Sequence, residues 1–229
     1  ADRMNEEASN CLLKTLEEPP TSTIIILIAN SLTPVKETIK SRCQIIRFHP
    51  IPAHIIEDQL VKRFNADTGK VGWISRFCSG SLGSAFELLE DNFYEKNTDI
   101  VDRISVSGID NLLLAEEFID TYLSSSDTLE EKRQSLRRIL NCILQFYRDL
   151  LVVKVRNIYG AGKKAPPLFN TDREDTLQRC ADYLTQKHIT DIINDILESI
   201  KFIDYNLNIN LLVENIFTRI AMLNSPERE

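Results

Sequence analysis

A glycine- and lysine-rich segment is the first pattern in this chain that could hold a phosphate group. It reads Gly160-Ala161-Gly162-Lys163-Lys164. A nucleotide-binding loop needs Gly-x-x-x-x-Gly-Lys-Ser/Thr, whose backbone amides and lysine hold the phosphates and whose hydroxyl binds Mg²⁺. Here Asn157 takes the place of the first glycine and Lys164 that of the hydroxyl. The segment also follows a predicted helix rather than a strand, so we interpret it as a basic loop that binds no nucleotide.

Histidine, serine and carboxylate residues show no spacing typical of a metal site or a catalytic triad. His49, His54 and His188 have no cysteine or carboxylate partner at metal-ligand spacing. No Gly-x-Ser-x-Gly sequence occurs, and no serine, histidine and acid group together as a nucleophile site. Glu17 and Glu18 are adjacent, so on a helix they point in different directions and indicate only an acidic helix end. We therefore expect no metal and no cofactor.

The composition is that of an ordinary soluble protein. Among 229 residues, 43% are hydrophobic and 27% are charged, the net charge is −7, and only 7 glycines and 8 prolines occur, which favours helices over a strand-rich fold. No apolar run reaches the roughly 18–20 residues of a membrane span, and no signal peptide is evident. The absence of any C-x-x-C pair predicts buried thiols in a reducing compartment, and hence a cytoplasmic protein. The cysteines are Cys11, Cys43, Cys78, Cys142 and Cys180.

Residues 1–49 have the pattern of part of an α/β domain. An apolar face at three- and four-residue spacing predicts a helix that ends at Pro19-Pro20. The β-branched run at 23–29 is typical of a central parallel strand, and 44–48 predicts a second strand. Between them, Thr33-Pro34 predicts the start of a short helix that ends near Lys40. These elements are too few for a complete sheet, so we expect the C-terminal half of a larger α/β core with an exposed strand edge.

From residue 50 onward the pattern is helical, which makes the expected fold class mainly α. Three short helices, at 52–65, 71–78 and 81–91, predict a small three-helix unit over 50–92. The remainder, 93–229, predicts an all-α bundle with one clear loop at 160–171. Its helices are expected at 94–105, 109–124, 129–157, 173–186, 189–206 and 209–223.

A group of motifs in the first 50 residues resembles a known family. Residues 12–20 read Leu-Leu-Lys-Thr-Leu-Glu-Glu-Pro-Pro, Asn30 follows the first predicted strand, and Ser41-Arg42-Cys43 precedes the second. In this order the set is similar to the second half of the AAA+ module in DNA polymerase clamp loaders. There the Leu-Leu-Lys helix follows the Walker B strand, and a polar sensor-1 residue ends the next strand. The resemblance implies that a P-loop and a Walker B motif lie upstream of Ala1.

The same resemblance implies that Arg42 is an arginine finger that reaches the ATP of a neighbouring subunit. A guanidinium group stays charged and offers a planar fork of donors, so it can stabilise charge on a transferring γ-phosphate. Taken without the motif, Arg42 would be interpreted as a structural salt bridge with a carboxylate such as Glu37. The loop after the first strand is slightly shorter than in the family, so sensor 1 is either Asn30 or Ser31, and we assign Asn30.

At residue 83 the sequence differs from the pattern of ATP-hydrolysing clamp-loader subunits, and this difference indicates the type of subunit. Subunits that hydrolyse ATP carry a sensor-2 arginine in a Gly-Ser-x-Arg pattern, where this chain has Gly80-Ser81-Leu82-Gly83. Glycine has no side chain to contact a phosphate, and this loss resembles the non-hydrolysing delta-prime class of bacterial loaders. The segments 146–151 and 206–214 resemble the collar helices of that class, although a generic helical bundle could also carry them.

The resemblance implies a fold and a function for the whole chain. Residues 50–92 would be the AAA+ lid and residues 93–229 the collar through which subunits associate. The chain would be a subunit without ATPase activity of its own, which helps to load the sliding clamp on primed DNA within the DNA polymerase III holoenzyme. Its partners would be loader subunits of the gamma/tau and delta types, the sliding clamp and primed DNA. The alternatives are a truncated gamma/tau-type ATPase and a helical adaptor that retains an AAA+ remnant.

Overall fold

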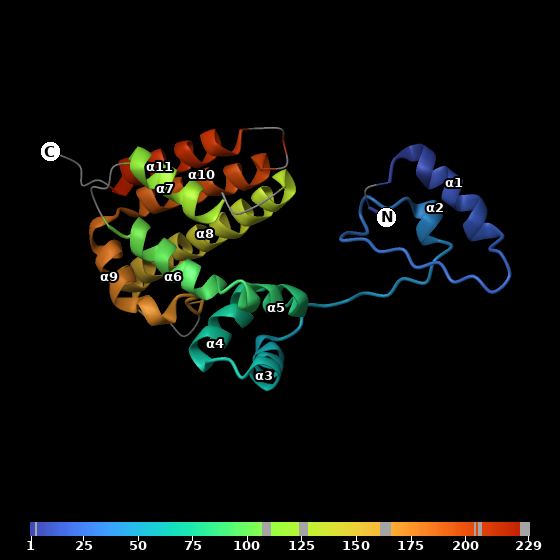
Figure 1. Ribbon diagram of the computed structural model, residues 1–229, viewed down its shortest axis with the longest axis horizontal. Coiled ribbons are helices and arrows are strands. Elements are labelled where there is room, and N and C mark those ends of the chain that lie inside the picture. Colours follow the sequence, from blue (N-terminus) through green and yellow to red (C-terminus); the bar gives the residue numbers. More distant parts are fainter. Residues whose placement is uncertain are drawn as a thin grey trace. The chain divides into compact units, whose positions relative to one another are not determined.

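The chain divides into two compact units, Ala1–His49 and Pro50–Glu229, which we call the N-terminal and the C-terminal unit. The computed structural model describes residues 1–2, 4–106, 111–123, 128–160, 166–203, 205 and 208–224. Within these residues the regular elements are α-helices and one short 3-10 helix (Figure 1). This confirms the mainly α fold class.

The N-terminal unit contains two helices that pack against each other, α1 (Glu6–Glu17) and α2 (Glu37–Lys40). The Asn5 side chain caps α1 by accepting a hydrogen bond from the Ala8 amide, and the helix ends just before the two prolines, as predicted. The predicted start of α2 at Thr33-Pro34 is wrong. Those two residues lie in a turn closed by the Val35 amide and the Leu32 carbonyl, so the helix begins only after the chain has reversed direction.

The two predicted strands, at 23–29 and 44–48, are not formed in the part of the chain that the structure describes. A strand exists only when a neighbouring strand supplies a ladder of backbone hydrogen bonds, and no described segment of this unit does so. The β-branched residues of the first segment therefore face solvent, with Ile24 88% and Ile28 80% exposed. Phe48, in the second segment, is 93% exposed. The expectation of strands here is thus corrected.

The C-terminal unit begins with the three predicted short helices, α3 (Ala53–Phe64), α4 (Thr68–Phe77) and α5 (Leu82–Glu90). Their apolar faces meet around Trp73, which is buried and stacks on Phe77 at a ring-centroid distance of 4.6 Å. Cys142, from a helix much later in the chain, belongs to the same hydrophobic cluster. The three helices therefore share their core with the bundle that follows.

A long helix, α8 (Leu129–Tyr159), lies at the centre of that bundle (Figure 1). It begins with a capping box in which the side chains of Thr128 and Glu131 accept from each other's backbone amides. The helix packs against α6, α9 and α10, and α7 packs against α11. The predicted helices are confirmed with small shifts, except that residues 107–110, 124–127 and 206–207 lie outside the described residues. The remaining elements are α6 (Phe93–Ile104), α7 (Asn111–Tyr122), η1 (Thr171–Arg173), α9 (Glu174–Tyr183), α10 (Gln186–Phe202) and α11 (Ile209–Asn224).

The cysteines differ in burial, which corrects the prediction that all five are buried. Cys78, Cys142 and Cys180 are buried, and burial raises the pKa of the Cys142 thiol well above its usual value. Cys43 is half-buried, and Cys11 is exposed because the face of α1 that carries it has no covering element within its unit. Among the described residues, no helix is both long and apolar enough to cross a membrane.

Candidate functional site

Arg42 lies two residues beyond the end of α2, where two segments of the N-terminal unit hold its guanidinium group. Its Nη2 donates to Glu17 Oε1 at 2.6 Å, and its Nη1 donates to the Thr38 carbonyl at 3.0 Å and to Ser41 Oγ at 3.3 Å. The Arg42 side chain nevertheless remains 37% exposed. The charge is therefore oriented by neighbours and still accessible from solvent.

The orientation of Arg42 depends on the packing of α1 against α2. At the start of α1, Lys36 Nζ lies 3.3 Å from Glu6 Oε1, and at its end Glu17 pairs with Arg42. Because residue 36 contacts the beginning of α1 and residue 42 its end, the segment from 36 to 42 runs in the same direction as α1. The Leu-Leu-Lys helix thus positions the arginine of the Ser-Arg-Cys motif.

The carboxylate that pairs with Arg42 differs from the one that the sequence suggested. Glu37, named as a structural partner, instead accepts from Lys40 Nζ at 2.7 Å within α2. The three-residue spacing of Glu37 and Lys40 on one helix was a local signal for that pair. Glu17 is 25 positions away from Arg42, and only the packing of the two helices brings it close.

Of the predicted site residues, Ser41 and Cys43 share a turn with Arg42, whereas Asn30 does not. Ser41 Oγ donates to the Thr38 carbonyl at 3.1 Å beside Arg42, and the Cys43 amide bonds to the Lys40 carbonyl in the same turn. Asn30 is exposed and forms no hydrogen bond with Arg42 among the residues described. The Ser-Arg-Cys motif is thus a single local structure, and Asn30 is not part of it.

A second cluster, which the sequence did not single out as a site, surrounds Asp149 in α8. This carboxylate is fully buried, at 0% exposure, and accepts from the amides of Phe169 and Asn170 at 2.9 and 2.8 Å. Arg148 Nη1 donates to Asp149 at 2.8 Å and to the Pro167 carbonyl at 2.6 Å. An acidic residue within the apolar run of a central helix was the available signal, since a buried carboxylate requires partners.

Asn170 extends this cluster to two further helices. Its Oδ1 accepts from Trp73 Nε1 in α4 and from Asn97 Nδ2 in α6, both at 3.3 Å, while its Nδ2 donates to Asp149 at 3.0 Å. Residues 167–170 therefore join α4, α6 and α8. The segment 146–151 has a structural role here, and of the segment 206–214 the first two residues lie outside the described ones.

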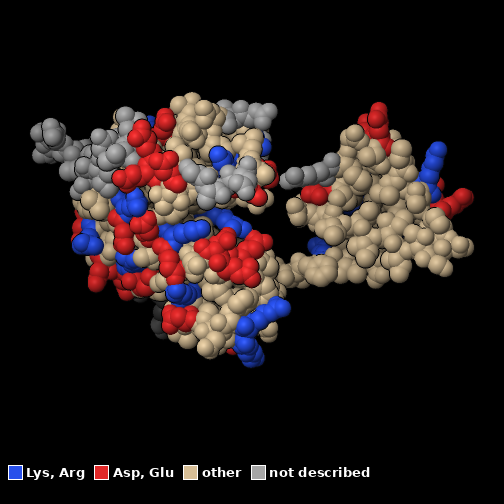
Figure 2. All heavy atoms as spheres, viewed as in Figure 1, with Lys and Arg blue, Asp and Glu red and all other residues tan. Residues whose placement is uncertain are grey.

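Charged side chains on the face of the C-terminal unit seen in Figure 2 are of mixed sign, while the visible N-terminal unit carries few of them. No continuous basic strip lies on this face. The basic loop at 160–164 is described only at Gly160. In the described part of the chain, no group of three histidine, cysteine or carboxylate residues could hold a metal ion.

Comparison with known proteins finds similarity to clamp-loader subunits. A family model for the DNA polymerase III delta subunit matches residues 1–52. DNA polymerase III subunit delta' of Bacillus subtilis (strain 168) is 27% identical over 94% of this chain and 62% of its own length. These matches confirm the resemblance to the clamp-loader family.

Other matches extend across the clamp-loader family. DNA polymerase III subunit gamma of Buchnera aphidicola is 24% identical over 93% of this chain and 61% of its own length. Replication factor C subunit 2 of Oryza sativa is 26% identical over 55% of this chain and 38% of its own length. The chain thus spans just over three fifths of the delta' and gamma relatives that it matches.

Gly83 has room for a side chain. It occupies the position at which the resemblance to clamp loaders predicts the sensor-2 arginine. It lies in the first turn of α5, and a Cβ atom added there would meet nothing within 4 Å. Gly80, at the start of the same motif, differs because its φ is +84° and a Cβ would lie 2.4 Å from Pro50 Cβ. Backbone geometry therefore requires the glycine at 80, whereas it does not require the one at 83.

This difference predicts opposite effects of two alanine substitutions. Gly83→Ala should stabilise the protein by about 0.5–1 kcal/mol, because glycine loses more backbone entropy in a helix than alanine. Gly80→Ala should destabilise it by about 1–3 kcal/mol, through left-handed strain and the clash with Pro50. Urea denaturation of both variants measures the two changes. Equal destabilisation by both variants would contradict the open space at Gly83.

Proposed function

We propose that this chain is part of a non-hydrolysing clamp-loader subunit of the delta-prime type, which supplies Arg42 to the ATP site of a neighbouring subunit. The observation that carries the proposal is the oriented, accessible guanidinium of Arg42. A guanidinium has five N–H donors, and the three described contacts leave donors for a phosphate. Fixed positive charge at a γ-phosphate stabilises the transition state of phosphoryl transfer.

Gly83 supports a subunit that does not itself hydrolyse ATP. Overall similarity does not separate the two subunit types, because the delta' and gamma relatives cover similar shares of the chain. The space around Gly83 would admit a side chain, so packing does not explain why the arginine is missing at this position. A lid without that arginine lacks a side chain to contact the nucleotide's phosphates.

In the whole protein, residues 1–49 would complete an AAA+ core, residues 50–92 would form the lid and residues 93–229 the collar. The partners would be gamma/tau- and delta-type subunits, with the sliding clamp and primed DNA engaged through the assembled complex. The subunit would then act in the cytoplasm as part of the DNA polymerase III holoenzyme. Asn30 would occupy the sensor-1 position without a nucleotide to sense.

Reconstitution tests this proposal with the complete protein. Alone, it should hydrolyse no ATP, and its addition to the other loader subunits should raise their ATP turnover in the presence of clamp and primed DNA. Turnover by the isolated protein would instead indicate the gamma/tau-type ATPase. Failure to co-purify with loader subunits would indicate the helical adaptor.

A further inference from the structure

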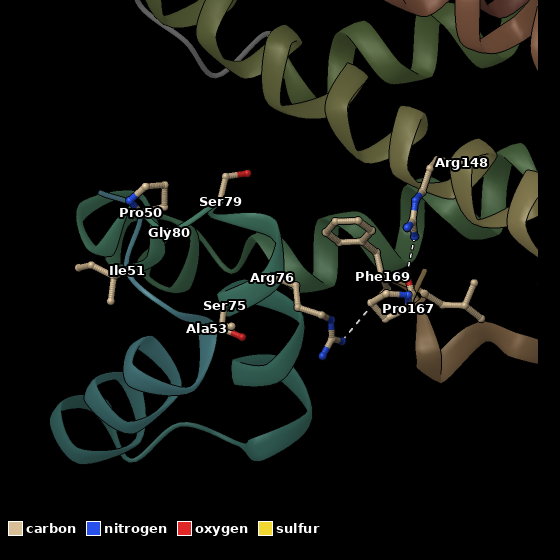
Figure 3. Close-up of a pocket in the computed structure, with 11 residues that line it drawn as sticks. Pro50, Ile51, Ala53, Ser75, Arg76, Ser79, Gly80, Arg148, Pro167 and Phe169 are labelled. Carbon is tan, nitrogen blue, oxygen red and sulfur yellow. Dashed lines mark hydrogen bonds between the residues drawn. The ribbon is translucent and has the colours of Figure 1, made fainter. Parts of the chain in front are cut away.

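A cavity of about 400 Å³ lies in the C-terminal unit between the start of α3, the end of α4 and the segment that follows Pro166. Two arginines line it, Arg76 from α4 and Arg148 from α8, together with the hydroxyl-bearing Ser79. Figure 3 shows both arginine side chains directed toward the segment that carries Pro167 and Phe169. The cavity therefore combines two guanidinium groups with a largely apolar lining.

Arg76 is incompletely satisfied by the protein. Its Nη2 donates to the Phe169 carbonyl at 3.2 Å, but its Nε is buried and has no acceptor among the residues described. Among the described residues, the Phe169 carbonyl is the acceptor that this guanidinium has across the cavity wall, and no carboxylate forms an ion pair with it. A buried donor without an acceptor is rare in folded proteins and indicates a place where an anion or ordered water completes the hydrogen bonding.

Arg148 adds a second fork of donors, which comes from α8. Only its Nη1 is used in the described contacts, by Asp149 and by the Pro167 carbonyl, and its guanidinium lies 5.2 Å from the centroid of the Phe169 ring. Asp149 also accepts from the backbone amides of Phe169 and Asn170, and it pairs with Arg148 through Nη1 only. The remaining donors of Arg148 are therefore available to a ligand.

The N-terminus of α3 also favours an anion in the cavity. Ala53 lines the cavity, and the preceding N-cap is Pro52, whose side chain caps no amide. The first turn of α3 contains no acidic residue. Unpaired amides at a helix N-terminus favour an anion, so the helix adds to the attraction of the two arginines.

We propose that this cavity binds a phosphate group, held between Arg76 and Arg148. A phosphate presents oxygens in a tetrahedral arrangement and can accept from two guanidinium forks at once, whereas a carboxylate fits one planar fork. The cavity is large enough for the phosphate of a small phosphorylated molecule as well as for the free ion. The site shares no residue with the Ser-Arg-Cys motif and does not depend on the function proposed above.

Calorimetric titration of the complete protein with inorganic phosphate, at constant ionic strength, tests this site. Arg76→Met should weaken binding by about tenfold or more, because a charge-assisted pair of hydrogen bonds is lost. Glu57→Gln should strengthen binding, since Glu57 accepts from the cavity-lining Ser75 at 2.8 Å and its negative charge opposes an anion. The matched control is Arg179→Met, an exposed arginine of α9, which should bind as the wild type does.

Three outcomes would overturn the proposal. They are no phosphate binding by the wild-type protein, an equal loss in the Arg179→Met control, and unchanged binding in Arg76→Met. If Arg76→Met does not fold, Arg76→Lys keeps the charge without the fork and should still bind more weakly than the wild type. A second titration with a phosphate monoester distinguishes the free ion from a phosphorylated molecule, because the apolar side of the cavity should favour the ester.

Discussion

Replacement of Arg42 by alanine is expected to lower ATP turnover of the reconstituted loader on the order of 10³-fold at the ATP site that this residue faces. The loss follows from removing a fixed guanidinium that would compensate negative charge on the transferring phosphoryl group. Under the proposed function, total turnover should fall less, because the substitution would leave the catalytic groups of any other ATP site in place. Single-turnover measurement of ATP hydrolysis in the assembled complex checks the expectation.

Two further variants separate catalysis from structure at Arg42. Arg42→Lys retains charge but loses the planar fork, so its turnover should stay close to that of the alanine variant. Glu17→Gln removes the same ion pair from the other side while leaving the guanidinium in place. If Glu17→Gln lowers turnover as much as Arg42→Ala, the residue acts only through its ion pair and the finger assignment is wrong.

Loss of folding stability should not account for the lower ATP turnover of the Arg42 variants. The pair between Glu17 and Arg42 is largely exposed, with side chains 51% and 37% accessible, so its loss should cost less than about 1 kcal/mol. Thermal denaturation of the Arg42 and Glu17 variants checks that each remains folded. A large drop in turnover at nearly unchanged stability would then reflect the lost charge at the ATP site.

Asp149→Ala is expected to destabilise the C-terminal unit by about 3–5 kcal/mol, the largest effect of any single substitution considered. The substitution removes a fully buried carboxylate and leaves the amides of Phe169 and Asn170 without acceptors. It also releases Arg148 from its ion pair inside the unit. Because Asn170 joins Asp149 to α4 and α6, the attachment of those helices to α8 should weaken as well.

Urea denaturation measures this loss, and Asp102→Ala provides a matched control. Asp102 pairs with Arg173 through two hydrogen bonds of 2.6 and 3.2 Å, but its side chain is 53% exposed. Exposed ion pairs contribute little, so the control should lose less than about 1 kcal/mol. Similar losses in the two variants would show that burial of Asp149 contributes nothing beyond an ordinary surface pair.

Local patterns in the sequence were enough to predict most of the helices, although not the start of α2. Pro19-Pro20 ends α1 because proline cannot donate the next helical hydrogen bond, and the capping pair Thr128 and Glu131 opens α8 through contacts only three residues apart. Most helical hydrogen bonds and caps join residues within four positions, so short windows contain the information that they need. The motif around Arg42 was equally visible, because it consists of consecutive residues.

Contacts between distant residues could be known only from the tertiary structure. The pairing of Arg42 with Glu17 spans 25 positions, the bond between Asp149 and Asn170 spans 21, and that between Trp73 and Asn170 spans 97. The segment at 23–29 also depends on distant contacts. Its β-branched residues favour a strand, but no described neighbour supplies the hydrogen bonds that a strand needs. Residue type sets what a side chain can do, but which partner it meets depends on how the helices pack.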